Sequence, residues 1–278
     1  MLKLNLQTES MQYLGLLKDC TSLETLQLED AGRVTDLEKT QNDVFNEVVL
    51  WLRNCNQLRS LSISKFINAA NLVVPLLLEE SVQLRSLEIS NYVVKDNRTF
   101  HQALGTNESL RSLFLAGDAE GMFRDDADIM LDSLCSLRGL RELELRGVSD
   151  YLNEDHITTL AANLTELEDL YITGNQVTDR VLPRVAALKS LKSITFGAMS
   201  LFSLEGLLNF VDSLGPGNSG IEVYVAMAEP QTTEHYRPLS DDEQAIIREQ
   251  LASKIDGRFE YVLYRDPDVE SFGDSDSD

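Results

Sequence analysis

Three segments of the chain share one pattern: LRSLSI at residues 58–63, LRSLEI at 84–89 and LRSLFL at 110–115. Each places apolar residues at its first, fourth and sixth positions, and the same spacing recurs at 23–28, 140–145, 167–172 and 191–196. Weaker copies stand at Met1, Leu4 and Leu6 and at Ile221, Val223 and Val225. From Leu26 to Ile194, the fourth residues of successive copies are 35, 26, 26, 30, 27 and 24 residues apart. Periods of this length predict an array of structural repeats.

Apolar residues with helical spacing fill the segments between these patterns, for example Val44, Val48 and Leu52. The alternating apolar residues of each pattern are typical of a strand, so each repeat is expected to form a strand, a turn and a helix. One such unit cannot bury both its strand and its helix, so neighbouring units must stack. The sequence therefore predicts an α/β fold, a right-handed leucine-rich repeat solenoid shaped as a horseshoe, with a concave parallel sheet and convex helices.

The repeats are expected to occupy residues 1–226. A polar stretch follows and indicates a loop, after which Ser240 and Glu243 form a capping box at the start of an expected helix. With the alternating strand pattern at 259–263, residues 227–265 are interpreted as a degenerate C-terminal capping repeat that covers the last hydrophobic face. The acidic residues that follow predict a disordered tail over residues 266–278.

A finer signature accompanies the leucines. Cysteines precede two of the patterns, at Cys20 and Cys55, and the triplet Val-Thr-Asp occurs at 34–36 and 177–179. In these features the chain resembles the ribonuclease-inhibitor-like and cysteine-containing leucine-rich repeats, the latter best known from F-box proteins, the substrate-binding subunits of cullin-type ubiquitin ligases. The resemblance implies a eukaryotic protein. In such repeats we expect the Thr-Asp pair to cap the following helix, and the cysteines and Trp51 to fill the core.

The chain of 278 residues carries 24 Lys and Arg against 46 Asp and Glu, a formal net charge of −22. This charge argues against nucleic acid or an anionic membrane as a partner and favours a protein with a basic surface. The sequence contains no long apolar run and no signal peptide after Met1. Three cysteines cannot all pair and are too sparse for a disulfide framework. We therefore expect an intracellular protein, in the cytoplasm or the nucleus.

No sequence motif indicates an enzymatic reaction. The segment from Gly215 to Gly220 matches G-x-G-x-x-G, but it follows an expected helix and leads into a strand, the reverse of the dinucleotide fingerprint. His101, His156 and His235 lie far apart in the repeat order, without Cys or His at metal-ligand spacing. We expect no catalytic residue, no cofactor and no metal site, and therefore no enzyme.

The residues between the buried apolar positions should line the concave face. From the first repeat to the last, this row reads Asn5, Gln27, Ser62, Glu88, Phe114, Glu144, Tyr171, Thr195 and Tyr224. Aromatic and acidic residues interleave at its centre, which suggests a site for a protein partner. The expected partner-binding residues are Glu88, Phe114, Glu142, Glu144, Arg146, Asp169 and Tyr171.

The two rims of the horseshoe are expected to differ in charge. Arg59, Arg85, Arg111 and Arg141 follow the first leucine of consecutive repeats and should stack where the strands begin. An acidic rim is expected where the strands end, formed by Asp118, Glu120, Asp125, Asp126 and Asp128. Opposite charges on the two rims could orient a protein partner by electrostatic steering.

Two functions fit this sequence. One is a non-catalytic module that recognises protein, resembling the substrate-binding part of an F-box ubiquitin ligase subunit, with a cullin-ligase adaptor bound through a region absent here. The alternative is a ribonuclease-inhibitor-like scaffold or regulator that binds and modulates another protein without any ubiquitin link.

Overall fold

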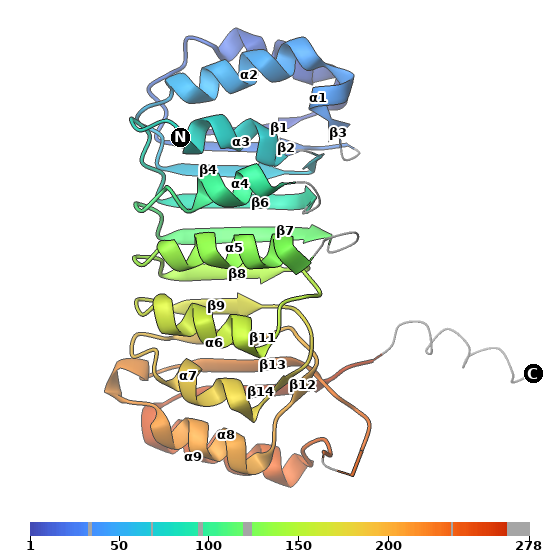
Figure 1. Cartoon of the computed structure of the whole chain (residues 1–278), viewed down its shortest axis with the longest axis vertical. Coiled ribbons are helices and arrows are strands. Elements are labelled where there is room, and N and C mark those ends of the chain that lie inside the picture. The colour runs from blue at the N-terminus through green and yellow to red at the C-terminus, as the bar shows by residue number, and fades with distance from the viewer. Residues whose placement is uncertain (33–34, 68, 94–96, 119–123, 235, 266–278) are drawn as a thin grey trace, which may run out of the picture.

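The computed structural model describes residues 1–32, 35–67, 69–93, 97–118, 124–234 and 236–265. It confirms the predicted α/β solenoid (Figure 1): strands stack side by side into one long parallel sheet, and the helices cover one of its faces. The opposite, uncovered face is the concave face. All strands of the main path run in the same direction, so the sheet has an entrance edge where strands begin and an exit edge where they end.

The strands of the central path have similar lengths and succeed one another along the solenoid. They are β1 (Leu2–Leu6), β2 (Thr25–Asp30), β4 (Ser60–Ser64), β6 (Ser86–Val93), β7 (Ser112–Asp118), β8 (Glu142–Arg146), β9 (Asp169–Ile172), β11 (Ser193–Phe196), β13 (Glu222–Ala228) and β14 (Arg258–Leu263). Short strands lie at the exit edge, namely β3 (Thr35–Asp36), β5 (Phe66–Ile67), β10 (Val177–Thr178) and β12 (Ser200–Leu201).

A helix follows nearly every strand. The α-helices are α1 (Leu37–Thr40), α2 (Asn42–Asn54), α3 (Ala69–Leu77), α4 (Arg98–Leu104), α5 (Arg124–Ser136), α6 (Glu154–Asn163), α7 (Leu182–Ala186), α8 (Leu204–Ser213) and α9 (Asp241–Ile255). The 3-10 helices are η1 (Thr8–Leu17), η2 (Asp179–Val181) and η3 (Pro216–Asn218).

The register of the sheet aligns the apolar residues of all repeats. The fourth residue of each pattern lies opposite the same residue of the next, in the order Leu26, Leu61, Leu87, Leu113, Leu143, Leu170, Ile194 and Val223. All eight side chains are buried. Burying one such side chain stabilises the fold by about 1.5–3 kcal/mol, so the continuous core accounts for the stacking of the repeats.

The first strand differs from the predicted register by two residues. Leu2 and Leu4 lie opposite Leu26 and Leu28, so Lys3 faces Gln27. The prediction placed Asn5 in that position and was wrong. A strand that alternates leucine with polar residues buries the same face after a shift of two residues, so its pattern alone does not fix the register.

The two cysteines of the signature behave differently. Cys55 is fully buried, and its thiol donates to the carbonyl of Trp51, while the indole nitrogen of Trp51 donates to the carbonyl of Cys20 at 3.0 Å. Trp51 and Cys55 therefore fill the core, as expected. Cys20 does not, because its side chain is exposed. Its backbone carbonyl, rather than its thiol, joins the first two repeats.

Hydrogen bonds at the predicted turns and caps support the same stacking. Asp36 accepts from the backbone N–H of Lys39 at 3.1 Å, as expected for a helix cap. The glycine-rich segment forms η3 between α8 and β13, a turn as predicted, and its buried Asn218 donates to the carbonyls of Leu188 and Leu191 at 2.8 and 3.1 Å. The turn is thereby fastened to the preceding repeat.

After β13 the chain makes one more helix and strand. Ser240 and Glu243 form the capping box at the start of α9, and β14 pairs in parallel with β13. Helix α9 ends at Ile255, and its C-cap residue Asp256 is in the left-handed conformation (φ 57°). Gly257 is needed for close approach, because a Cβ there would lie 2.9 Å from the carbonyl oxygen of Ile221. The expected tail lies outside the described residues.

One buried polar cluster interrupts the core between β6 and α5. His101 is fully buried, and its Nε2 lies 2.7 Å from the hydroxyl of Tyr92, while its Nδ1 has no hydrogen-bond partner among the described residues. Burial lowers the pKa of His101 to about 4, although the nearby carboxylate of Asp126 opposes this shift. The folded protein therefore holds this imidazole neutral at pH values where the unfolded chain protonates it.

We expect this histidine to make the fold sensitive to acid. Because the pKa of His101 is about 4 in the folded protein and 6.5 in the reference state, stability is lost as the pH falls through that window. The loss between pH 7.5 and pH 5 is about 2 kcal/mol. Urea unfolding of wild type and His101→Gln at both pH values measures it. The variant should lose about 2 kcal/mol less than wild type, and an equal loss in both proteins would contradict this account.

The cysteines should differ in reactivity. Burial, and then the neighbouring Cys20, raise the pKa of the Cys55 thiol to about 11, and burial raises that of Cys135. Thiolates are the reactive species, so iodoacetamide at pH 7.5 should modify Cys20 first in the native protein. Mass spectrometry of digested peptides measures each rate. Denaturant should bring the three rates together, and equal rates in the native protein would show that Cys55 is not buried.

Candidate functional site: the concave face

The strand register arranges the concave side chains into rows that run along the solenoid. The middle row contains Lys3, Gln27, Ser62, Glu88, Phe114, Glu144, Tyr171, Thr195, Tyr224 and Glu260. From Gln27 to Tyr224 this is the predicted order. Parallel strands lie about 4.8 Å apart, so residues 24 to 36 positions apart in the chain become neighbours.

Arg146 covers the two aromatic residues at the centre of this face. Its guanidinium carbon lies 4.4 Å from the ring centre of Tyr171 and 5.4 Å from that of Phe114. Glu144 holds the guanidinium through contacts of 2.7 and 3.0 Å. We call Phe114, Glu144, Arg146 and Tyr171 the aromatic platform. Each cation–π contact of this exposed kind is worth about 0.5–1 kcal/mol, so the platform is ordered before any partner binds.

A glycine directly after the next strand, β11, makes room for Tyr171. A Cβ on Gly197 would lie 3.1 Å from the hydroxyl oxygen of Tyr171 and 2.8 Å from the Cγ2 of Thr173. The hydroxyl of Tyr171 therefore lies close to Gly197, at the exit end of β11. Thr173 in turn accepts from the backbone N–H of Gly147 at 2.8 Å, beside Arg146.

A group of carboxylates lies beside the platform toward the entrance edge. Glu142 is directly opposite Asp169, which lies opposite Ser193, and Ser193 lies opposite Glu222. Burial raises the pKa of Asp169, and so does repulsion from Glu142, Glu168, Glu144 and Glu222, in that order. We call these five residues the acidic cluster.

The cations near the acidic cluster neutralise it only in part. Glu144 pairs with Arg146, Glu168 with Arg141 at 3.2 Å, and Glu222 with Arg258 at 3.4 Å. Among the described residues, no ion pair is formed by Glu142 or Asp169. The free protein therefore concentrates uncompensated negative charge beside an aromatic platform, an arrangement suited to a lysine or arginine side chain from a partner.

The N-terminal half of the concave face is small and polar. Ser62 precedes Glu88 in the middle row, and the hydroxyl of Ser90 donates to that of Ser64 at 2.7 Å. Glu88 lies opposite Phe114, at the border with the aromatic platform. The structure thus brings together all seven residues expected to bind a partner, with Glu88 at the margin.

The acidic rim is less continuous than expected. Asp126 is buried and forms an ion pair with Arg98 through its Oδ1 at 2.5 Å. Its charge therefore compensates that of an arginine in the neighbouring repeat instead of facing solvent. Asp128 is exposed but lies 3.2 Å from Nε2 of His156. Asp125 is exposed, Asp118 ends β7, and Glu120 lies outside the described residues. Asp126 lies on the buried side of α5. The number of acidic residues in this segment does not predict which of them faces inward.

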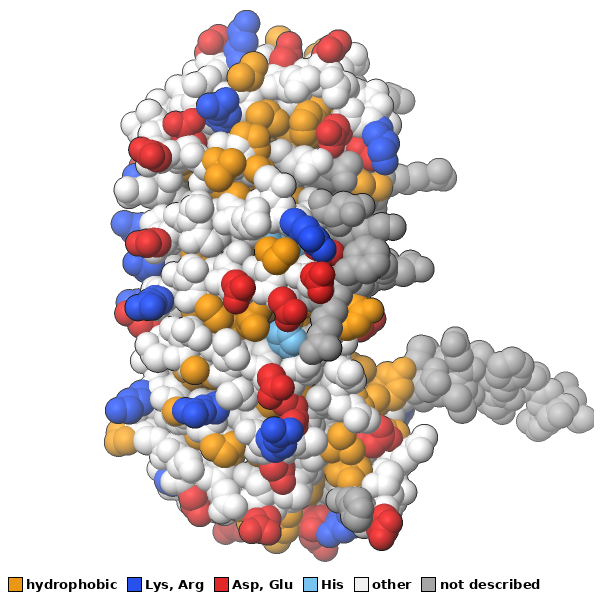
Figure 2. Space-filling view, in the orientation of Figure 1, with side chains coloured by type: hydrophobic (Ala, Val, Ile, Leu, Met, Phe, Trp, Pro, Cys, Tyr) orange, Lys and Arg blue, Asp and Glu red, His pale blue; other side chains and the backbone are white. Residues whose placement is uncertain are grey.

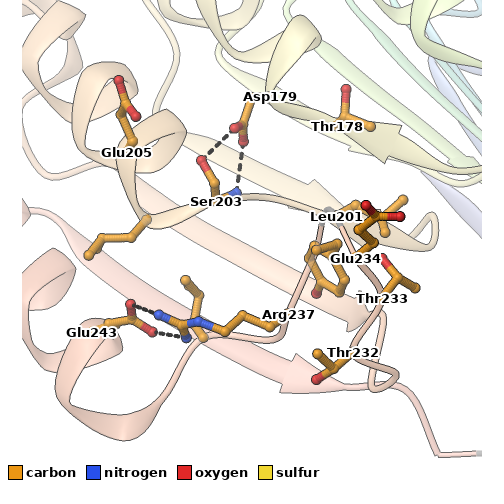
Figure 3. A pocket seen from close by; sticks show the side chains of 13 residues that line it. Thr178, Asp179, Leu201, Ser203, Glu205, Thr232, Thr233, Glu234, Arg237 and Glu243 are labelled. Atoms are coloured by element: carbon orange, nitrogen blue, oxygen red, sulfur yellow. Dashed lines mark hydrogen bonds and ion pairs between the residues drawn. The ribbon is translucent and has the colours of Figure 1, made fainter.

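A cavity of about 780 Å³ opens at the exit edge near the C-terminal end of the solenoid (Figure 3). Its carboxylates support the surrounding backbone. Asp179 accepts from the N–H and hydroxyl of Ser203 at the start of α8, at 2.9 and 2.6 Å. Two hydrogen bonds from Arg237, at 2.6 and 2.7 Å, together with the Ser240 N–H lower the pKa of Glu243 to about 2. Asp179 is therefore engaged at the start of α8, and Glu243 is engaged in the capping box of α9 and in its ion pair with Arg237.

The described residues contain no group of three or more His, Cys, Asp or Glu side chains arranged to hold a metal ion. In the same part of the chain, no helix combines the length and apolar character needed to cross a bilayer.

Two residues of the acidic cluster were missed from the sequence. Glu168 occupies the position that arginine holds in the four preceding repeats, and Glu222 occupies the first strand position, like Glu142 and Asp169. Aligning the repeats by that first strand position, rather than by the middle row alone, would have identified Glu222.

Comparisons with known proteins bear on the fold alone. No protein-family model and no curated protein matches the chain. Among solved structures, the crystal structure of a structural-genomics target from Bacteroides fragilis is similar, with a TM-score of 0.53 and 15% sequence identity. The alignment covers 91% of this chain and 70% of that protein. The likeness extends along the solenoid and carries no information about partners.

Repulsion within the acidic cluster should reduce stability at neutral pH. An aspartate whose pKa is raised by folding destabilises the fold above that pKa, and the penalty disappears as the pH falls below it. Asp169→Asn should therefore raise the free energy of unfolding at pH 7.5, measured by urea denaturation. The expected gain is a few tenths of a kcal/mol because the site is partly exposed. Asp19→Asn makes the same charge change at an exposed position away from the cluster. Equal effects of both substitutions would contradict local repulsion.

Proposed function

We propose that this chain is a non-catalytic protein-recognition module whose concave face binds a basic segment of another protein. The observation that carries the proposal is the acidic cluster beside the aromatic platform. Asp169 is half-buried among four other carboxylates, and no cation of the described chain pairs with it or with Glu142. A positively charged side chain from a partner would remove that repulsion.

The aromatic platform supplies the second half of the interaction. Tyr and Arg are enriched among residues that dominate binding energy at protein interfaces. Arg146 and Tyr171 are held in place by Glu144 and by each other, so little conformational entropy remains to be lost on binding. The carboxylates would favour a partner with a basic surface and raise its association rate. The aromatic platform would supply apolar contact area.

The finer form of the proposal follows the sequence resemblance. Buried Cys55 and the Asp36 helix cap support a cysteine-containing leucine-rich repeat, as in F-box proteins. On this proposal the concave face recruits a substrate to a cullin-type ubiquitin ligase in the cytoplasm or nucleus of a eukaryotic cell. The helical repeats equally support a ribonuclease-inhibitor-like regulator. Co-purification of a ligase adaptor with the natural protein would favour the first function, and a stable one-to-one complex without an adaptor would favour the second.

The experiment is a comparative pull-down with two matched triple variants. Glu142→Gln, Asp169→Asn and Glu222→Gln neutralise the acidic cluster. Asp19→Asn, Glu166→Gln and Glu249→Gln remove the same charge from exposed positions without described ion pairs. Quantitative mass spectrometry identifies proteins retained by wild type and by the control but lost with the cluster variant.

For such a partner, calorimetry should give an affinity about 3-fold to 150-fold weaker for the cluster variant, since each of three ion pairs contributes about 0.2–1 kcal/mol. Tyr171→Ala should weaken binding further, by removing the anchor of the platform. Identical eluates from both triple variants, or equal affinities for the identified partner, would overturn the proposal.

A further inference from the structure

A second charged surface lies on the entrance edge, in the N-terminal half of the solenoid. Four arginines directly precede four neighbouring strands of the sheet. They are Arg59 before β4, Arg85 before β6, Arg111 before β7 and Arg141 before β8. The backbone N–H groups of Arg85, Arg111 and Arg141 each donate to the carbonyl of the arginine before them, at 2.7 to 2.8 Å. We call the first three the arginine ladder. Lys and Arg side chains lie along this edge at the level of β4 to β8, with Asp and Glu side chains among them (Figure 2).

The arginine ladder has no carboxylate partner among the described residues. Arg141 pairs with Glu168, but Arg59 donates only to the carbonyls of Leu58 and Gln83. The side chain of Arg111 donates to the carbonyls of Glu108 and Leu110, and the side chain of Arg85 is exposed with no described hydrogen bond. What distinguishes these three arginines is that they are neighbours in one row, so their like charges repel and an external anion would relieve that repulsion.

The surroundings of the arginine ladder favour binding. Each ladder arginine is followed by a half-buried serine on the concave side, Ser60, Ser86 and Ser112, which lie opposite one another in the sheet. Gly139 leaves space for Arg111, because a Cβ there would lie 2.5 Å from its Nη1. Guanidinium groups are donors suited to carboxylates.

The spacing of the ladder selects a helical ligand. Adjacent strands are about 4.8 Å apart, so the three arginines extend over about 10 Å. Carboxylates on one face of an α-helix recur about every 5.4 Å, and three of them extend over about 11 Å. Side chains on one face of an extended strand recur at about 6.7 Å, so three extend over about 13 Å. The helical repeat is the closer match.

We propose that the arginine ladder binds an acidic α-helix of a protein partner, lying along the solenoid with carboxylates at i, i+3 or i+4, and i+7. This site is distinct from the acidic cluster, which begins on β8 and has the opposite charge. The net charge of −22 disfavours a nucleic acid, whose phosphates extend far beyond three arginines.

Fluorescence anisotropy tests the proposal with a labelled alanine-based helix that carries glutamates at i, i+4, i+7 and i+11. A second peptide has the same composition, with its glutamates placed around the whole helix. Wild type is compared with Arg59→Gln, Arg85→Gln, Arg111→Gln and with a control, Lys18→Gln, Arg184→Gln, Lys189→Gln. The control residues are exposed and make no described ion pair, and both triple variants change the net charge by the same amount.

At low ionic strength the one-face helix should bind wild type and the control within twofold of each other, and the ladder variant at least tenfold more weakly. The second peptide should bind wild type at least threefold more weakly. The single substitution Arg85→Glu removes no described contact, so it tests the site should the triple variant fail to fold. It should weaken binding at least threefold.

Equal weakening in both triple variants would overturn the proposal by showing a general charge effect. Tighter binding of a twelve-nucleotide single-stranded DNA than of the one-face helix would overturn it in favour of nucleic acid. The variant that neutralises the acidic cluster should still bind the acidic helix at least as tightly as wild type. Failure at the arginine ladder is thereby distinguishable from failure of the proposed concave site.

Discussion

Hydrogen bonds between parallel strands fix the register of the concave sheet, and each surface row depends on that register. The aligned apolar residues from Leu26 to Val223 are buried beneath the sheet, so the residues between them must point to the concave side. A shift of one residue in any strand would expose its leucines and bury its charges. The same alignment that stabilises the core therefore assembles Phe114, Glu144 and Asp169 from three different repeats.

Sequence patterns predicted the fold and the central residues of the site because burial repeats with a fixed period. They failed where a side chain's position depends on neighbouring elements. Asn5 was misplaced because a shift of two residues satisfies the same leucine pattern. Cys20 matched a motif yet is exposed, and Asp126 belonged to an acidic loop yet is buried against Arg98. The position of Arg146 over two rings also depends on three strands at once.

The charged residues of the concave side divide the solenoid into two halves. Among the described residues, arginines without an acidic partner lie at the entrance edge of β4 to β7, whereas Glu142 and Asp169 lie on β8 and β9 without a basic partner. Within each group like charges repel, which lowers the stability of the free protein. Such repulsion is common where a surface is adapted to a partner rather than to folding. On our proposals, one partner or two would contribute the missing charges.

The in-register stacking of repeats can be tested by thiol cross-linking in a Cys20→Ser, Cys135→Ser background. Phe114→Cys and Glu144→Cys place thiols on opposed residues of β7 and β8, whereas Phe114→Cys and Glu142→Cys place them on the diagonal. The Cα separations should be about 5 and 8 Å. A cross-linker that spans about 5 Å should join the first pair much faster than the second. Faster linkage of the diagonal pair would contradict the register, and with it both proposed surfaces.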